Sequence, residues 1–260
     1  MPIIQNGNYY IYKQNVKNRQ KTRKFSAILI FFLIILLVFC VFLTFTKINF
    51  TNMFNMNKYL IFEEKTYFGL SICSGEREEV LSNQTYIRAN GGAGYVYNSG
   101  EKYFLIASIY QTENDANSVA EKLTDYQTEI VKFKLENLIL SAEYTSEQLT
   151  TLKYVLNQVN RAVIEISKIT TSFDRGEILE GEAKQKLQIF GTSCQQDKES
   201  LSNAFPSCCD NIIAHAKIFC NQTVSYVTST NLSTNFSSDA KNLMIEIVVN
   251  FLDFQKNIKK

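Results

Sequence analysis

Residues 101–135 read EKYFLIASIYQTENDANSVAEKLTDYQTEIVKFKL, and the prediction for the surrounding region starts from this stretch. Residues 101–110 are rich in aromatic and β-branched side chains, which predicts a strand. Residues 112–126 begin with Thr112, a favourable N-cap, and carry acidic residues in the first turn, which predicts a helix. Residues 128–135 alternate between apolar and polar side chains, as a second strand does. The stretch therefore predicts a strand–helix–strand unit.

A related unit precedes it. TYFGLSIC (66–73) is aromatic and β-branched, and GEREEVLSN (75–83) has a short helical pattern. GGAGYVYNSG (91–100) supplies a glycine turn and a short strand through residues 95–97. The whole order is βαββαβ, which predicts four strands with both helices on one face. The other face is then free to bind a ligand.

At residues 103–123, YFLIASIYQTENDANSVAEKL resembles the core pattern of the SPOR (sporulation-related repeat) domain. In that pattern an aromatic strand leads through a small residue and an aromatic residue into a helix lined by Ala and Leu. The matching residues are Tyr103, Phe104, Ser108, Tyr110, Ala116, Ala120 and Leu123. GGAGYVY is similar to the turn and second strand of divergent SPOR-like domains on single-pass proteins of Firmicutes. The resemblance covers residues 59–140 and implies a ferredoxin-like (RNP-like) fold.

The resemblance also implies a ligand, because typical SPOR domains bind peptidoglycan glycan strands with the open face of the sheet. If residues 103–110 alternate regularly, every second side chain shares that face. The candidate ligand-binding residues are Phe104, Ile106, Ser108 and Tyr110. The opposite set, assigned to the helix-covered face, is Tyr103, Leu105, Ala107 and Ile109. Aromatic rings can stack on sugar faces, and hydroxyls can bond to sugar edges. The alternative, in which both faces are packed in a core, stays open.

Residues 25–46 form an uncharged apolar run of 22 residues, long enough for a transmembrane helix. Residues 1–24 carry six Lys or Arg and no acid, whereas residues 47–260 carry 21 basic and 25 acidic side chains. The positive-inside rule then places the N-terminus in the cytoplasm and residues 47–260 outside. We expect a cytoplasmic tail, a single membrane span and, at residues 47–57, a polar stalk. A cleaved signal peptide is disfavoured, because the run is too long and no small-residue cleavage site follows it.

Residues 141–260 contain long stretches with helical periodicity, which predicts an all-α bundle. Apolar residues repeat every three or four positions in the first stretch, as in a heptad seam. The seam is Leu149, Leu152, Leu156, Val159, Val163, Ile166, Thr170 and Phe173. Further helices are predicted near residues 177–204, 208–227 and 239–257. The seam packs either against these helices or, through residues 146–173, against a partner protein or a second copy.

The composition argues against catalysis. A single histidine in 260 residues disfavours most hydrolases, since His is the usual general base. We expect no enzymatic activity, no catalytic residues, no cofactor and no metal. Cys194, Cys208, Cys209 and Cys220 lie near His215 without the usual zinc spacing, so a disulfide, reduced thiols or a metal site remain alternatives. The acidic body of the chain disfavours nucleic acid as a partner.

Taken together, the predicted fold class is α+β: a transmembrane helix at 25–46, a βαββαβ SPOR-like domain at 58–140 and a helical bundle at 141–260. The predicted function is peptidoglycan binding by a single-pass protein of the cell membrane, in cell division or sporulation. The alternative is a scaffold protein whose helical region dimerises or recruits a partner and binds no glycan.

Overall fold

The computed structural model describes residues 59–140, 144–207, 210–229 and 235–259. Residues 58–260 form one compact unit. Its strands are β1 (Tyr59–Phe62), β2 (Lys65–Gly75), β3 (Tyr95–Asn98), β4 (Tyr103–Tyr110), β5 (Glu129–Leu135) and β6 (Leu138–Leu140). Its helices are α2 (Arg77–Ala89), α3 (Glu113–Ala120), α4 (Ser146–Leu156), α5 (Gln158–Asp174), α6 (Glu180–Ala204), α7 (Asn211–Ser229) and α8 (Phe236–Ile258).

The strands form two antiparallel sheets. Four of them lie side by side in the order β3-β4-β2-β5, and β1 pairs with β6 in a separate two-stranded ribbon. β2 is the longest strand and bonds to both β4 and β5. The first and last strands of this region, β1 and β6, have no counterpart among the strands expected from the sequence.

Side chains at the helix starts explain where two of the helices begin. The Thr112 hydroxyl accepts a hydrogen bond from the backbone N–H of Asp115 at 3.1 Å, which caps α3. At α4, Thr145 accepts from the N–H of Gln148, and the Gln148 side chain accepts from the N–H of Thr145 in return. This reciprocal capping box satisfies two N–H groups that lack helical partners.

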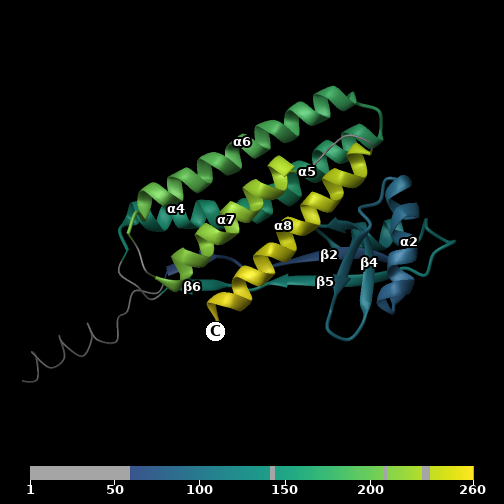
Figure 1. The fold of residues 1–260 in the computed structure, drawn as a ribbon, viewed down its shortest axis with the longest axis horizontal. Coiled ribbons are helices and arrows are strands. Elements are labelled where there is room, and N and C mark those ends of the chain that lie inside the picture. Colours follow the sequence, from purple (N-terminus) through teal and green to yellow (C-terminus); the bar gives the residue numbers. More distant parts are fainter. Residues whose placement is uncertain (1–58, 141–143, 208–209, 230–234, 260) are drawn as a thin grey trace, which may run out of the picture. The chain divides into compact units, whose positions relative to one another are not determined.

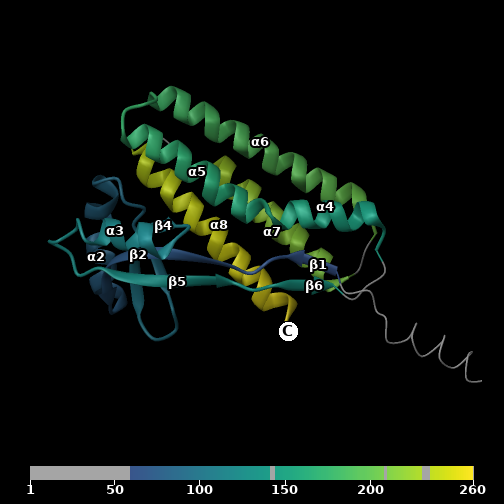
Figure 2. The same ribbon diagram turned by 180° about the vertical axis from the view of Figure 1, so that it is seen from behind.

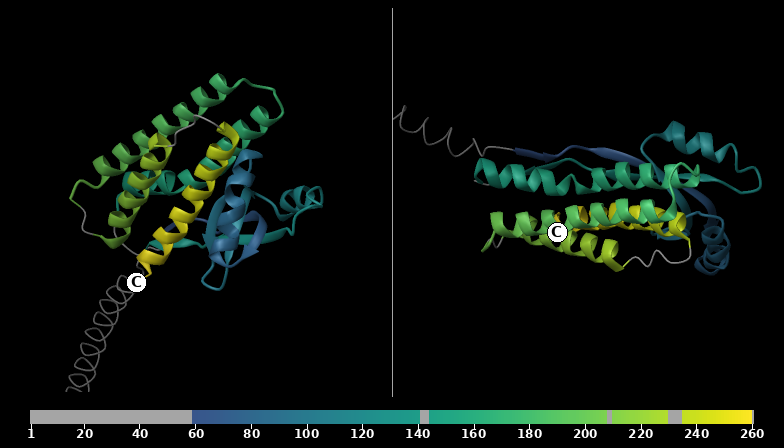
Figure 3. Two further views of the ribbon diagram at one scale, coloured as in Figure 1. Left: turned by 45° about the vertical axis from the view of Figure 1, so that its right-hand side comes forward. Right: turned by 90° about the horizontal axis from the view of Figure 1, so that it is seen from above.

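The larger sheet is covered on both faces (Figure 1 and Figure 2). On one face α2 packs over β2, β3 and β4, with a small core that includes Val80, Ile87 and Leu105, while α3 lies over β2, β4 and β5. On the other face α8 contacts β4 and β5 and also packs against α5 and α7 (Figure 3). A single large core of buried side chains runs from this face of the sheet into the helices.

α8 is buried on most of its sides because it lies among these neighbours. Its buried apolar residues are Phe236, Ala240, Leu243, Met244, Ile245, Ile247, Val248, Phe251 and Phe254. A helix with so broad an apolar face needs several partners, and here the sheet is one of those partners. The C-terminal helices are thus part of the same core as the sheet.

The fold class predicted from the sequence is therefore wrong. The described chain is α+β with a mostly helical C-terminal region, and its two parts share one core where a separate SPOR-like domain and bundle were expected. No helix among the described residues is long and apolar enough to cross a membrane. The segment predicted to do so, 25–46, lies outside the described residues, as do the tail and stalk. A separate domain and bundle do not form because the apolar faces of α8 and of the sheet bury each other in one core.

The heptad seam of residues 149–173 is divided between α4 and α5, which meet at Asn157. Most of its side chains are fully buried within this chain, as in the self-packing alternative. The buried members are Leu152, Leu156, Val159, Val163, Ile166 and Thr170. A dimer formed through residues 146–173 would have to use other side chains of these helices, and such a dimer stays a prediction.

Candidate binding cleft at the free edge of β4

The four residues predicted to bind glycan do not lie on an open surface. Phe104 is 6% exposed and Ile106 is fully buried, and both belong to the core that continues into the helices. Ser108 and Tyr110 are half-buried. The sheet face that was expected to be free is covered by α8, which contacts β4 and β5, and the ammonium of Lys102 lies 4.8 Å from the centre of the Phe104 ring.

Nor do the four residues share one face of the sheet, because the register between β2 and β4 shifts. Leu70 pairs with Ser108, but the next residue, Ser71, pairs with Ile106. Ala107 is thus an extra residue in β4, as in a β-bulge, and a bulge reverses the alternation beyond it. Ile109, which is 1% exposed, therefore continues the buried row of Phe104 and Ile106 in place of Ser108.

The bulge lies where β4 loses its neighbour. β3 pairs only with residues 103–106, and the last contact on this side is the N–H of Ala93, which donates to the carbonyl of Ala107 at 2.7 Å. Among the described strands, none pairs with residues 108–110 on the side away from β2. This free strand edge forms one wall of a cleft.

The cleft has a volume of about 680 Å³ and lies between β4, α3, the end of α5 and the start of α8. Its lining is mainly hydroxyl-bearing and charged. Its hydroxyl-bearing and charged lining includes Ser108, Tyr110, Ser118, Thr171, Asp174, Arg175 and Lys241. We call this space the β4-edge cleft. Two of the four residues predicted from the sequence, Ser108 and Tyr110, thus meet in it with residues that sequence reasoning missed.

Tyr110 is the aromatic residue of the β4-edge cleft. Burial raises the pKa of its phenol above the ordinary value, and the charges of Asp115 and Asp174 act in the same direction. A hydrogen bond with Ser108 acts in the opposite direction. Tyr110 is therefore protonated at neutral pH and presents both a ring and a neutral hydroxyl.

The wall opposite α3 is held by Lys241. Its ammonium group donates to Oδ2 of Asp174 at 2.8 Å and to the carbonyl oxygen of Gly91 at 2.9 Å. These two bonds connect α8 to the end of α5 and to the turn after α2. Among the described residues, no hydrogen-bond partner is found for the side chains of Ser118 and Thr171, so both hydroxyls are available to a ligand.

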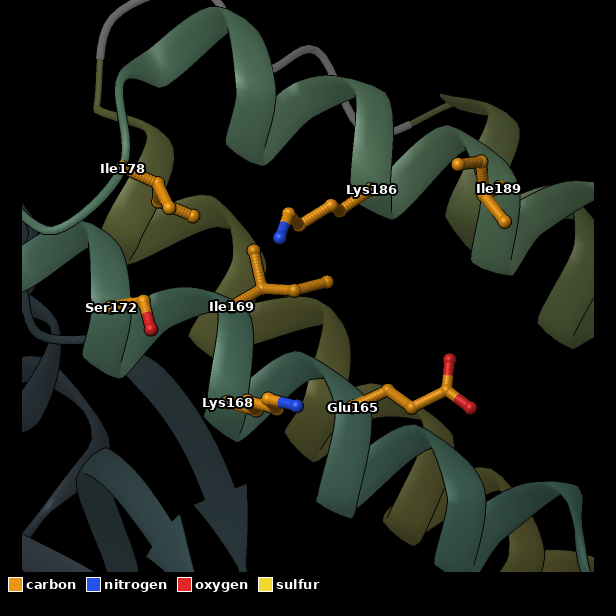
Figure 4. A pocket seen from close by; sticks show the side chains of 7 residues that line it. All are labelled: Glu165, Lys168, Ile169, Ser172, Ile178, Lys186 and Ile189. Carbon is orange, nitrogen blue, oxygen red and sulfur yellow. The ribbon is translucent and has the colours of Figure 1, made fainter.

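Two other pockets have linings of a different chemistry from that of the β4-edge cleft. A groove of about 250 Å³ between α5 and α6, the α5/α6 groove, is lined by Ile169, Ile178 and Ile189 with Lys168 and Lys186 (Figure 4). Ile189 is 64% exposed there. A third pocket, of about 400 Å³, lies between α7 and α8 and carries tyrosines and carboxylates.

The cysteines that could be compared with a metal site do not form one in the described residues. No group of three or more His, Cys, Asp or Glu side chains is placed there to hold an ion. Cys194 and Cys220 are buried free thiols on α6 and α7. Burial raises the pKa of Cys194 to about 12, and burial also raises the pKa of the Cys220 thiol. Cys208 and Cys209 lie outside the described residues.

No family model, no curated protein and no solved structure matches this chain.

Proposed function

We propose that the protein binds peptidoglycan glycan strands in the β4-edge cleft. One observation carries the proposal: Ser108 and Tyr110 line a polar cleft in which free hydroxyls and charged groups face each other. Its volume of about 680 Å³ falls within the range usual for ligand sites. The proposal keeps the ligand that the SPOR resemblance implies but moves the binding surface from the sheet face to the strand edge.

The chemistry of the lining suits a glycan. A sugar ring presents an apolar face to an aromatic ring such as Tyr110 and hydroxyls to Ser118 and Thr171. Glycan strands of peptidoglycan also carry lactyl or carboxylate groups. Arg175 lies at the rim with its side chain 69% exposed, and its guanidinium can hold a carboxylate through two parallel hydrogen bonds.

The free strand edge suits an extended polymer. No strand of the described part of the chain lies beside residues 108–110 on the cleft side, so no described ladder uses their backbone groups there. Unpaired N–H and C=O groups on an edge offer a row of donors and acceptors. A chain of sugars lying along this edge would meet a repeating set of partners as well as the side chains.

The predicted location forms part of the proposal. Binding of cell-wall glycan requires residues 59–259 to lie outside the cell membrane, which is the side that the charge pattern of residues 1–46 favours. This part rests on the sequence alone.

Retention of the full chain on amidase-treated sacculi tests the proposal. Arg175→Gln and Ser118→Ala are expected to lower retention, the first by about tenfold if it removes a charge-assisted hydrogen bond. Lys186→Gln, in the α5/α6 groove, is the control with the same loss of charge. Equal retention of Arg175→Gln, Ser118→Ala and the control, or no retention of the native chain, would refute glycan binding in this cleft.

A second candidate function, partner recruitment by the helical region, is favoured by the α5/α6 groove. Ile189, which is 64% exposed, and the half-buried Ile178 have no covering element there among the described residues, and exposed apolar side chains of this kind often mark protein contacts. A photo-crosslinking residue at position 189 tests it, with position 199 on the same helix as the control. Cross-links from both positions alike, or from neither, would count against a docking surface.

A further inference from the structure

The pocket between α7 and α8 carries a ligand chemistry different from that of the β4-edge cleft. It has a volume of about 400 Å³ and is completed by Tyr95 from β3. Its polar lining includes Tyr95, Tyr226, Glu246, Asn250 and Asp253. Phe219 and Phe254, both almost fully buried, contribute apolar surface. We call this space the α7/α8 pocket.

The α7/α8 pocket is negative. Glu246 is half-buried, and its side chain receives one hydrogen bond among the described residues, from Nδ2 of Asn242 at 2.9 Å. No Lys or Arg of the described residues forms an ion pair with it. Burial raises the pKa of the Glu246 carboxyl, although the bond from Asn242 and the charge of Arg88 lower it. A half-buried carboxylate without an ion-pair partner among the described residues is stabilised in its charged form when a cation binds beside it.

The second carboxylate, Asp253, is paired only weakly. Its Oδ1 lies 3.4 Å from the ammonium of Lys256, and both side chains are more than half exposed. Two carboxylates thus face one lysine in the pocket, with His215 also in its lining. The excess of negative charge among these side chains disfavours an anionic ligand and favours a positively charged one.

A buried amide adds an acceptor at the same place. Asn250 is 6% exposed and lines the α7/α8 pocket. Its Nδ2 donates to the carbonyl of Phe219 at 3.3 Å and lies 3.5 Å from Oγ1 of Thr223. Its Oδ1 accepts no hydrogen bond from a described residue and is not among the fully buried atoms without a partner, so this acceptor is open to water or to a ligand.

The aromatic residues of the α7/α8 pocket favour an organic cation over a metal ion as the ligand. Burial raises the pKa of Tyr95 to about 12, and the negative charge of Glu246 adds to this effect, so the phenol stays neutral beside the carboxylate. Tyrosine rings attract organic cations through their faces. A primary alkylammonium group offers N–H donors to the acceptors of the pocket and an apolar stem to its aromatic rings, and a metal ion offers neither.

We propose that the α7/α8 pocket binds a primary alkylammonium group, with Glu246 and Asn250 Oδ1 as acceptors, Asp253 adding negative charge further along α8, and Tyr95 and Phe254 beside the stem. Either a free diamine or a lysine side chain of a polypeptide can supply such a group. This site is independent of the β4-edge cleft, and failure of either one leaves the other intact.

Isothermal titration of the full chain in detergent tests the proposal, with pentane-1,5-diamine in one arm and N-acetyl-lysine methylamide in the other. N-acetyl-norleucine methylamide, which has a similar stem and no charge, is the ligand control. Both ammonium compounds or one of them should bind, the norleucine compound should not, and added salt should weaken binding. Tighter binding of the diamine identifies a small molecule as the source, and tighter binding of the lysine compound identifies a polypeptide.

Variants decide whether binding occurs at this site. Glu246→Gln keeps the shape and the bond to Asn242 and is expected to weaken binding about tenfold or more. Glu199→Gln, on the exposed side of α6, is the matched control and should bind as the native chain does. The proposal is overturned if neither ammonium compound binds, if the norleucine compound binds equally well, or if Glu246→Gln and Glu199→Gln have the same affinity.

Discussion

Lys241 on α8 donates a hydrogen bond to Asp174 at the end of α5, with Nζ and Oδ2 2.8 Å apart. The same ammonium donates to the carbonyl oxygen of Gly91 at 2.9 Å. One lysine thus holds together three segments that are far apart in the sequence, and it does so in the wall of the β4-edge cleft.

Lys241→Met is expected to lower the free energy of unfolding by about 1–3 kcal/mol, because it leaves Gly91 and Asp174 without their common donor. Urea denaturation followed by circular dichroism measures this. Lys256→Met, which removes an exposed lysine from a long ion pair on the same helix, should change stability by less than about 1 kcal/mol. Similar losses in the two variants would show that the Lys241 contacts do not stabilise the fold.

Ile106→Ala tests whether the sheet face is covered by α8. The side chain is fully buried in the shared core, so its truncation should cost about 2–5 kcal/mol of unfolding free energy. Ser108→Ala, two positions further on and half-buried at the cleft, should cost much less. If the face were open, as the regular alternation predicted, the two variants would differ little.

Gly69→Ala probes the close approach of β2 and β5. A Cβ atom at this glycine would lie 2.5 Å from Cε2 of Phe133, a buried side chain, so the ring would have to move. We expect a loss of about 1–3 kcal/mol in thermal or urea unfolding. Gly181→Ala on α6 is the control, because nothing lies within 4 Å of its Cβ position, and it should stabilise by about 0.4–1 kcal/mol. Recovery in the double variant Gly69→Ala/Phe133→Leu would locate the strain at the ring.

Glu246→Gln is expected to change the pH dependence of stability. Because burial raises the pKa of this carboxyl in the folded state, its ionisation costs stability once the pH exceeds the ordinary pKa of about 4.3. Below that pH the native chain and the variant should melt alike, and as the pH rises to neutrality the variant should become the more stable. A melting-temperature difference that stays constant between acid and neutral pH would contradict the raised pKa.

Much of the local structure was readable from residue type and spacing. β4 and β5 lie within the stretches predicted at 101–110 and 128–135, and α3 begins at the predicted cap, Thr112. Strong strand formers and a capping hydroxyl act within a few residues, so their effects do not depend on the rest of the chain.

Only two of the four candidate site residues predicted from the sequence line the cleft, because the others depend on pairing with a distant strand. Ser108 and Tyr110 were chosen by strand alternation, and both line the cleft, but Phe104 and Ile106 are core residues. The bulge at Ala107 lies between the two buried residues and the two cleft residues. No residue type in the sequence predicts this bulge, because its position is set by the pairing of β4 with Leu70 and Ser71 on β2. Thr171, Arg175 and Lys241 reach the cleft from segments that adjoin it only after folding.

Residue type and spacing predict most of the strands and helices, with β1 and β6 as exceptions, because propensity, capping and apolar periodicity are properties of neighbouring residues. Which apolar faces meet, in contrast, depends on how the whole chain packs. α8 is apolar on most sides, and whether it packs on the sheet, on other helices or on both depends on the total buried area and fit of all the elements at once. Because α8 packs on the sheet, the sheet face is covered, and the free edge of β4 stays accessible in the β4-edge cleft.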